Sequence, residues 1–186
     1  MQHLSLEKLL NGLSEIRQSP SDSGTVELIV RRPAENEREE LENGNITLQG
    51  LEGDNWKFKP SSSMPNGEPH PLKQITIMNS RAIALISQEG TRRALAGDQI
   101  YADLNLSYSN IPPGTRLQIG EAIVEVSTPP HRGCKKFADR FGADAMRFVN
   151  SEEGRELNLR GINTHVIKAG TFSLGDIICK LETTQL

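Results

Sequence analysis

The chain has 186 residues, enough for one domain with a substantial hydrophobic core, and its formal net charge is −3 with a sequence pI near 5.8. This acidic balance argues against nucleic acid or an acidic membrane surface as the main partner, and no apolar run is long enough to span a bilayer. Two cysteines are too few for a disulfide framework and the N-terminus carries no signal segment, so we expect a cytoplasmic protein.

The N-terminus is predicted to form an amphipathic helix. Leucines and isoleucines recur there at helical spacing, and Ser5 is suited to cap a helix over residues 5–17. Residues 18–24, rich in serine, predict a linker or turn. We therefore divide the chain into residues 1–23, a helix with its linker, and residues 24–186, the main domain.

The main domain is predicted to consist mostly of short strands separated by turns. Residues 25–30 are β-branched and apolar, as strands are, whereas residues 31–45 are charged and predict a solvated loop. Short strands at this spacing predict a mainly β fold, an antiparallel β-barrel with several short helices. The other predicted strands are 74–79, 116–119, 122–127, 162–167 and 172–181, and the predicted helices are 80–90, 91–96 and 136–149, with a fresh helix cap at Ser151.

Cys134 lies in the most informative segment, residues 128–137, which surrounds one thiol with a histidine, an arginine and two lysines. Positive neighbours favour the thiolate, the form that acts as nucleophile or metal ligand. The apolar pattern that follows predicts a helix beginning near Cys134, and a helix N-terminus also stabilises negative charge. Gly133 is expected to leave room beside the sulfur for another molecule. The alternative is a buried cysteine on a loop that happens to be basic.

Two further roles for the thiols can be weighed from the sequence. His131 and Cys134 have the spacing of two zinc ligands, but no second Cys/His pair lies nearby, so a zinc site is not predicted. A nucleophilic Cys–His pair stays open, with no orienting carboxylate assignable from sequence. Cys179 alternates with Ile177 and Leu181 on one face of a strand, which predicts a core position without reactivity.

Several polar residues are candidates for binding an anion. Arg160 precedes a predicted strand, where a surface arginine and an anion clamp are equally compatible with the pattern. Asn79-Ser80-Arg81 lies at a strand-to-helix junction, for which ordinary helix capping is the favoured explanation. His165 falls within a predicted strand and is interpreted as a structural histidine.

An ordered set of motifs surrounds Cys134 and resembles one known family. The motifs are Gly97-Asp98, Asp-Leu-Asn-Leu-Ser at 103–107, Pro-Gly-Thr-Arg-Leu-Gln-Ile-Gly at 113–120, Glu-Val-Ser at 125–127, Arg-Gly-Ile-Asn-Thr-His-Val at 160–166, Gly170, and Gly175-Asp176. Their order around one cysteine resembles the MOSC family, named after the C-terminal domain of molybdenum cofactor sulfurase. The resemblance covers about residues 25–180.

The resemblance implies a mostly antiparallel barrel that binds molybdenum cofactor, a pterin dithiolene carrying a phosphate. Cys134 matches the family cysteine, which would carry persulfide sulfur or ligate molybdenum. Asn105, Arg160 and Asn163 match polar family positions near the cofactor, and we count His131, beside the cysteine, among the expected cofactor-binding residues. Arg81, Arg116 and Arg132 compete with Arg160 for the cofactor phosphate.

As a stand-alone MOSC-like protein, the chain would reduce N-hydroxylated or N-oxygenated small molecules with electrons from separate reductase proteins. The alternative is a carrier of cofactor or of persulfide sulfur supplied by a desulfurase, and a third possibility is a barrel that only contacts other proteins. Pyridoxal phosphate binding belongs to the family at large, since we expect this chain to lack the pyridoxal-phosphate desulfurase domain of the sulfurases. It departs from the family in having Gly133 where proline often precedes the cysteine.

Overall fold

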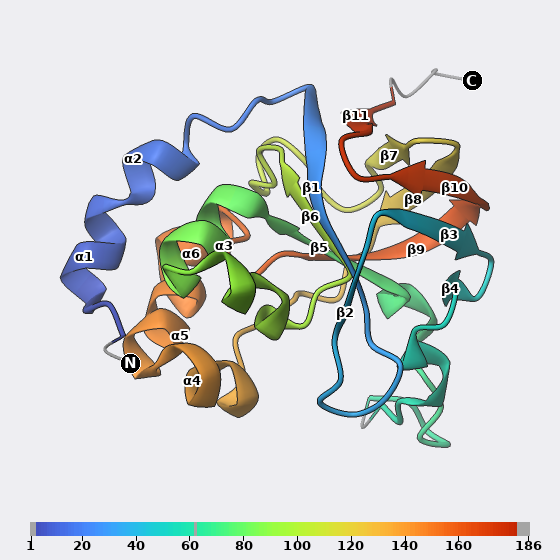
Figure 1. The fold of residues 1–186 in the computed structure, drawn as a ribbon, viewed down its shortest axis with the longest axis horizontal. Coiled ribbons are helices and arrows are strands. Elements are labelled where there is room, and N and C mark those ends of the chain that lie inside the picture. The colour runs from blue at the N-terminus through green and yellow to red at the C-terminus, as the bar shows by residue number, and fades with distance from the viewer. Residues whose placement is uncertain (1–2, 62, 182–186) are drawn as a thin grey trace.

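A closed β-barrel forms the centre of the computed structural model, which describes residues 3–61 and 63–181 (Figure 1). Strand β1 pairs with both β6 and β11, and this double pairing closes seven strands into a ring. A short strand outside the ring, β2 (Glu39–Leu41), pairs antiparallel with the end of β1. Around the ring the order is β1 (Ser23–Arg31), β11 (Ile177–Lys180), β7 (Arg116–Ile119), β8 (Ala122–Val126), β9 (Ile162–Lys168), β5 (Ile75–Asn79) and β6 (Ile100–Asp103).

The barrel is mixed rather than wholly antiparallel, because β5 and β6 run parallel. Parallel neighbours need a crossover connection. Helix α3 (Ser80–Ser87) and the 3-10 helix η3 (Gly90–Ala96) provide it. The predicted strand and helices of this region are confirmed, but hydrophobic alternation does not say which strands pair, so the parallel step was missed.

A second, three-stranded sheet lies beside the barrel (Figure 1) and includes residues that were predicted to be loop. It consists of β10 (Gly170–Ser173), β3 (Asn43–Thr47) and β4 (Gly50–Leu51), all antiparallel. Gly44 lies opposite Phe172, and a Cβ on Gly44 would lie 2.4 Å from the Phe172 ring. Glycine therefore makes room for a buried aromatic ring in this sheet. The predicted strand 172–181 divides between β10 and β11.

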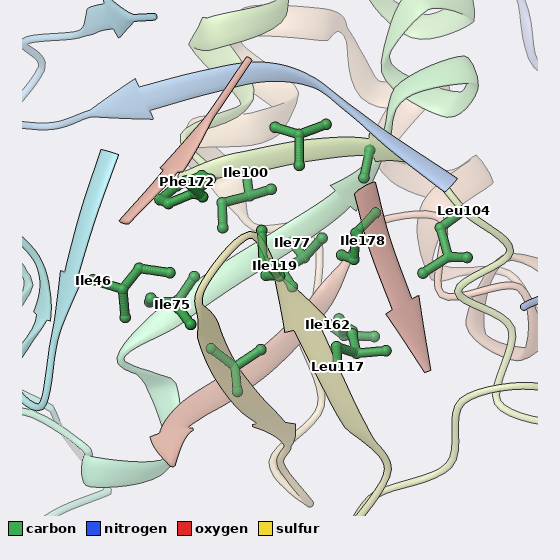
Figure 2. Close-up of a cluster of buried hydrophobic side chains, with 14 of the residues drawn as sticks. Ile46, Ile75, Ile77, Ile100, Leu104, Leu117, Ile119, Ile162, Phe172 and Ile178 are labelled. Atoms are coloured by element: carbon green, nitrogen blue, oxygen red, sulfur yellow. The ribbon is translucent and has the colours of Figure 1, made fainter. Parts of the chain in front are cut away.

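The interior of the barrel is filled by aliphatic side chains from every strand of the ring (Figure 2). Ile77 and Ile100 point inward, whereas the adjacent Met78 and Tyr101 belong to a second core between the barrel and the helices. Fully burying one such side chain contributes about 1.5–3 kcal/mol. In β11 the predicted inward face is wrong by one residue: Ile178 is buried, Ile177 is 57% exposed, and Cys179 is partly exposed.

The α-helices of the described residues gather on one side of the barrel (Figure 1). The predicted N-terminal helix is two helices, α1 (Leu6–Asn11) and α2 (Leu13–Ile16), and Ser5 caps the first by accepting a hydrogen bond from the Lys8 amide. The buried Leu9, Leu13 and Ile16 pack in the second core. This extension is therefore docked on the helical layer. Within the described ranges, no helix has the length and apolarity to cross a bilayer.

The helical segment after Cys134 is also broken. Gly142, with φ 92°, separates α4 (Lys135–Phe141) from α5 (Ala143–Asn150). Ser151 caps α6 (Glu152–Glu156), as predicted, by accepting a hydrogen bond from the Gly154 amide at 3.0 Å. Two further 3-10 turns, η1 (Asn55–Phe58) and η2 (Pro71–Lys73), lie in the long loop that precedes β5.

Candidate functional site

The segment between β8 and α4, residues 127–134, runs between two cavities, and we call it the cysteine arm. Pro130, His131 and Arg132 of the arm line both cavities, together with Asn163 at the start of β9. One cavity, of about 280 Å³, carries three prolines and is named the proline cavity. The other, of about 440 Å³, is named the cationic cavity. The arm is the shared wall of a two-part site.

The cationic cavity is lined by basic residues and by no carboxylate. Arg32, Lys59, Lys73 and Arg132 contribute to the lining, together with two histidines. The guanidinium of Arg32 is held from behind by Asp54, with Nη2 and Oδ1 2.8 Å apart. Burial raises the pKa of Asp54, but the hydrogen bonds from Arg32 outweigh it and keep that pKa below its usual value. The other cations have no such counterion in the cavity wall, so the cavity attracts anions.

A buried carboxylate, Asp98, lies behind the arm. Its Oδ2 accepts a hydrogen bond from Nη1 of Arg160 at 2.5 Å, and its Oδ1 lies 3.3 Å from Nδ1 of His131. Arg160 also donates to the Ala96 carbonyl and lies over the Phe137 ring at 5.0 Å. Both terminal nitrogens of Arg160 are thus engaged internally, and it lines neither cavity. Arg160 supports the site from behind.

His131 carries an uncharged imidazole in this setting. Burial lowers its pKa to about 3, and the Arg160 guanidinium acts in the same direction, against the opposing effect of Asp98. For Asp98, burial raises the pKa, but the charge and hydrogen bond of Arg160 bring it below its usual value. The site therefore presents a neutral histidine beside an ionised carboxylate. The sequence did not indicate Asp98 as a neighbour of His131, although its Gly97-Asp98 pair was among the motifs.

Cys134 is an exposed free thiol at the N-cap of α4, confirming that a helix begins there. It lines neither cavity, although its neighbour Arg132 lines both. Gly133 holds the arm against α5, since its amide donates to Asn150 Oδ1 and its carbonyl accepts from Asn150 Nδ2, both at 3.0 Å. A Cβ on Gly133 would lie 2.8 Å from Val149 Cγ2. The expectation that Gly133 leaves room for a ligand is wrong, because that space is filled by α5.

The basic neighbours of Cys134 differ in their partners. Lys135 pairs with Asp139 on its own helix, and Lys136 pairs with Glu35 at 2.6 Å. Arg132 is exposed and makes no hydrogen bond or ion pair with any other described residue. It is the arm's available cation.

The other candidate arginines are neutralised. Arg81 pairs with Asp103 at 2.8 Å and with Glu15, and Arg116 pairs with Glu125. At the same junction Asn79 caps α3, the explanation favoured from sequence. Of the four arginines that competed for the cofactor phosphate, Arg132 alone lacks a carboxylate partner in the part of the chain that the structure describes.

The two candidate asparagines, Asn105 and Asn163, lie in different places relative to the cavities. Asn163 is buried, lines both cavities, and donates from Nδ2 to the Pro129 carbonyl at 2.9 Å, which fixes the arm. Asn105 lies just after β6, at the opposite end of that strand from Asp98. It lines neither cavity. Its Oδ1 accepts from the Ser107 amide at 3.0 Å, so the side chain shapes its own loop.

The basic wall of the cationic cavity contains functional candidates that sequence reasoning missed. Arg32, Lys59 and Lys73 come from three separate segments and carry no motif of their own. His165, expected to be structural, has its Nδ1 3.2 Å from the Ser127 hydroxyl. Among residues 3–61 and 63–181, no cluster of three or more His, Cys, Asp or Glu could hold a metal ion.

The chain matches no family model and no curated protein. Its fold is similar to that of the YuaD protein from Bacillus subtilis, with a TM-score of 0.62 and 14% identity over 84% of this chain and 94% of that one. It is also similar to YiiM from Escherichia coli, with a TM-score of 0.56 and 17% identity over 87% and 72% of the two chains. For YiiM from Geobacillus stearothermophilus the TM-score is 0.53 and the identity 14%, over 86% and 73%. These similarities support a MOSC-like fold.

Proposed function

We propose that the protein binds molybdenum cofactor at the cysteine arm. The observation that carries this proposal is the cationic cavity, whose basic lining contains no carboxylate and adjoins the loop that ends in the free thiol of Cys134. The phosphate of the cofactor is the kind of group that such a cavity attracts, because arginine and lysine make charge-assisted hydrogen bonds to phosphate oxygens.

The residues present fit this cofactor. Arg132 and Lys73 would bind the phosphate, with Arg32 fixed behind them by Asp54. The neutral His131 would exchange a hydrogen bond with the pterin, while Asn163 keeps the arm in place through the Pro129 carbonyl. A thiolate at Cys134 suits molybdenum, a metal that accepts soft sulfur ligands.

When bound, the cofactor would supply a two-electron redox centre for reducing N-hydroxylated or N-oxygenated compounds, with electrons from separate reductase proteins. The chain's own contribution is to bind the anion, to orient the pterin and to present a sulfur ligand.

A second candidate function is sulfur carriage, and the exposure of Cys134 favours it. The thiol lies outside both cavities and is accessible to another protein. The Cys134 thiolate would attack the terminal sulfur of a persulfide on a desulfurase. A sulfur–sulfur bond forms on Cys134, and the desulfurase cysteine leaves as a thiolate.

Purification from a host that makes the cofactor tests the first proposal. We expect bound molybdenum by elemental analysis and pterin by fluorescence in the wild type and in the Cys179→Ala control. Cys134→Ala should lose most of the molybdenum, and Arg132→Gln should lose pterin, whereas the exposed Lys168→Gln should retain both.

A wild-type protein free of both molybdenum and pterin would overturn the cofactor proposal. Persulfide on Cys134 by mass spectrometry, without molybdenum, would establish sulfur carriage instead. Bound cofactor that does not turn over hydroxylamines with a competent electron donor would indicate a cofactor carrier.

A further inference from the structure

The proline cavity differs in chemistry from the cationic cavity across the arm. Its lining includes the apolar side chains of Ile111, Val126 and Ile162 and the rings of Pro113, Pro129 and Pro130. Its volume of about 280 Å³ lies at the lower end of the range for small-molecule sites. The phosphate-binding function already proposed does not use this space.

The proline cavity has an exposed aromatic ring in its lining. Tyr108 contributes to the lining and is 56% exposed, unusually open for so large an apolar ring. Rings stack on such faces and on flat proline rings. The small volume and these flat walls suit one planar ring.

The charged lining of this cavity is positive only. Arg132 and Arg155 both line it, and no carboxylate does. Arg155 lies on α6, is exposed, and its guanidinium makes no hydrogen bond or ion pair within the described chain. Two guanidinium groups without counterions match a carboxylate, which each can bind through paired N–H groups.

We infer that the proline cavity binds a planar single-ring carboxylate, with Arg155 and Arg132 on the carboxylate and Tyr108 on the ring. That this ligand is the substrate rests on the proposed function, because Arg132 and His131 line both cavities and place the ligand beside the cofactor cavity. The binding itself requires no cofactor.

Titration of the full chain, purified from a host that cannot make the cofactor, tests the inference with benzoate and its neutral isostere benzamide. Isothermal calorimetry or amide chemical shifts give the dissociation constants. We expect benzoate to bind about tenfold more tightly than benzamide, the size of one charge-assisted contact. Arg155→Gln should remove most of that preference and leave only the part that Arg132 supplies, whereas Arg155→Lys should keep more of it. The control Arg147→Gln, on the exposed side of α5, should change neither constant.

Equal affinity for benzoate and benzamide, or equal effects of Arg155→Gln and Arg147→Gln, would overturn the inference. Tyr108→Ala should weaken both ligands, whereas Tyr108→Phe should not, and each variant is compared at an unchanged unfolding midpoint. The titration uses cofactor-free protein, so the two proposals can fail separately. Benzoate selectivity in this titration, together with no molybdenum in protein purified from a host that makes the cofactor, would refute the proposed function alone. Molybdenum loading without benzoate selectivity would refute this inference alone.

Discussion

At the scale of single residues, the decisive arrangement is the contact between Asp98 and two cationic or potentially cationic groups. Asp98 is fully buried, and its charge persists because the guanidinium of Arg160 pairs with it at 2.5 Å. One full cation already compensates that carboxylate, and a second positive charge on His131 would meet the Arg160 field in a poorly solvated site. The imidazole therefore stays neutral. The arm thus presents an uncharged hydrogen-bond donor or acceptor between the proline cavity and the cationic cavity.

This arrangement predicts acid sensitivity. The pKa of His131 is about 3 in the folded protein, against 6.5 for the ordinary side chain. Between these values only the unfolded chain takes the proton, so the free energy of unfolding falls as pH decreases from about 6.5 toward about 3, by up to about 1.4 kcal/mol per pH unit. Urea unfolding of wild type and His131→Asn at intervals between pH 7 and pH 4 measures this. The variant should show the shallower pH dependence; parallel curves would contradict the assignment.

At the scale of elements, the position of the cysteine arm depends on its close contact with the end of α5. Asn150 binds both the amide and the carbonyl of Gly133, so the last turn of α5 serves as the template for the arm. Proline at position 133, frequent in MOSC proteins, would lack the amide that donates to Asn150. The glycine at this position is therefore matched by Asn150, which uses the Gly133 amide that a proline would lack.

Gly133→Ala should displace the arm. Its Cβ would lie 2.8 Å from Val149 Cγ2 and 3.1 Å from Asn150 Nδ2, and the β-branched valine can yield little. We expect a loss of about 1–3 kcal/mol in the free energy of unfolding, the usual cost of overpacking, and weaker anion binding. Gly90→Ala is the matched control, because nothing lies within 4 Å of its Cβ position. Val149→Ala in the Gly133→Ala background should restore part of both properties, and no recovery would argue against this contact as the cause.

At the scale of the whole molecule, charge is segregated. The net charge is −3, yet neither the proline cavity nor the cationic cavity is lined by a carboxylate. The acidic groups are used elsewhere: Asp54 and Asp98 lie behind the cavities, and Glu35 and Asp139 neutralise lysines near the thiol. An acidic protein can therefore present a local anion site, which the overall charge conceals.

Anion binding to the cationic cavity should raise the unfolding temperature. Pyrophosphate is the probe, because it carries the charges that this lining attracts and binds the folded state only. We expect a higher midpoint in thermal unfolding with pyrophosphate than with chloride at equal ionic strength. Lys73→Gln should reduce that increment and Lys168→Gln, outside the cavity, should not. An equal increment in both variants would place the anion elsewhere.

Sequence patterns alone predict the mainly β barrel, the helix that begins at Cys134, the caps at Ser5 and Ser151, and the basic segment that carries the thiol. These features depend on local periodicity, capping chemistry and residue order, which are legible in one chain. Hydrophobic periodicity predicts the orientation of short strands less reliably. In β11 it predicted that Ile177 faces inward, whereas the buried residue is its neighbour Ile178.

The set of residues that line the two cavities follows from the folded structure and not from the sequence pattern. Arg32, Lys73 and Arg132 are far apart in the chain and meet because the barrel and its loops bring them to one cavity. Arg81 and Arg116 pair with carboxylates and are therefore not available to bind a phosphate. Arg160 is buried behind the cysteine arm and lines neither cavity. Charge compensation and strand pairing are properties of contacts between distant segments, and no local pattern in the sequence records them.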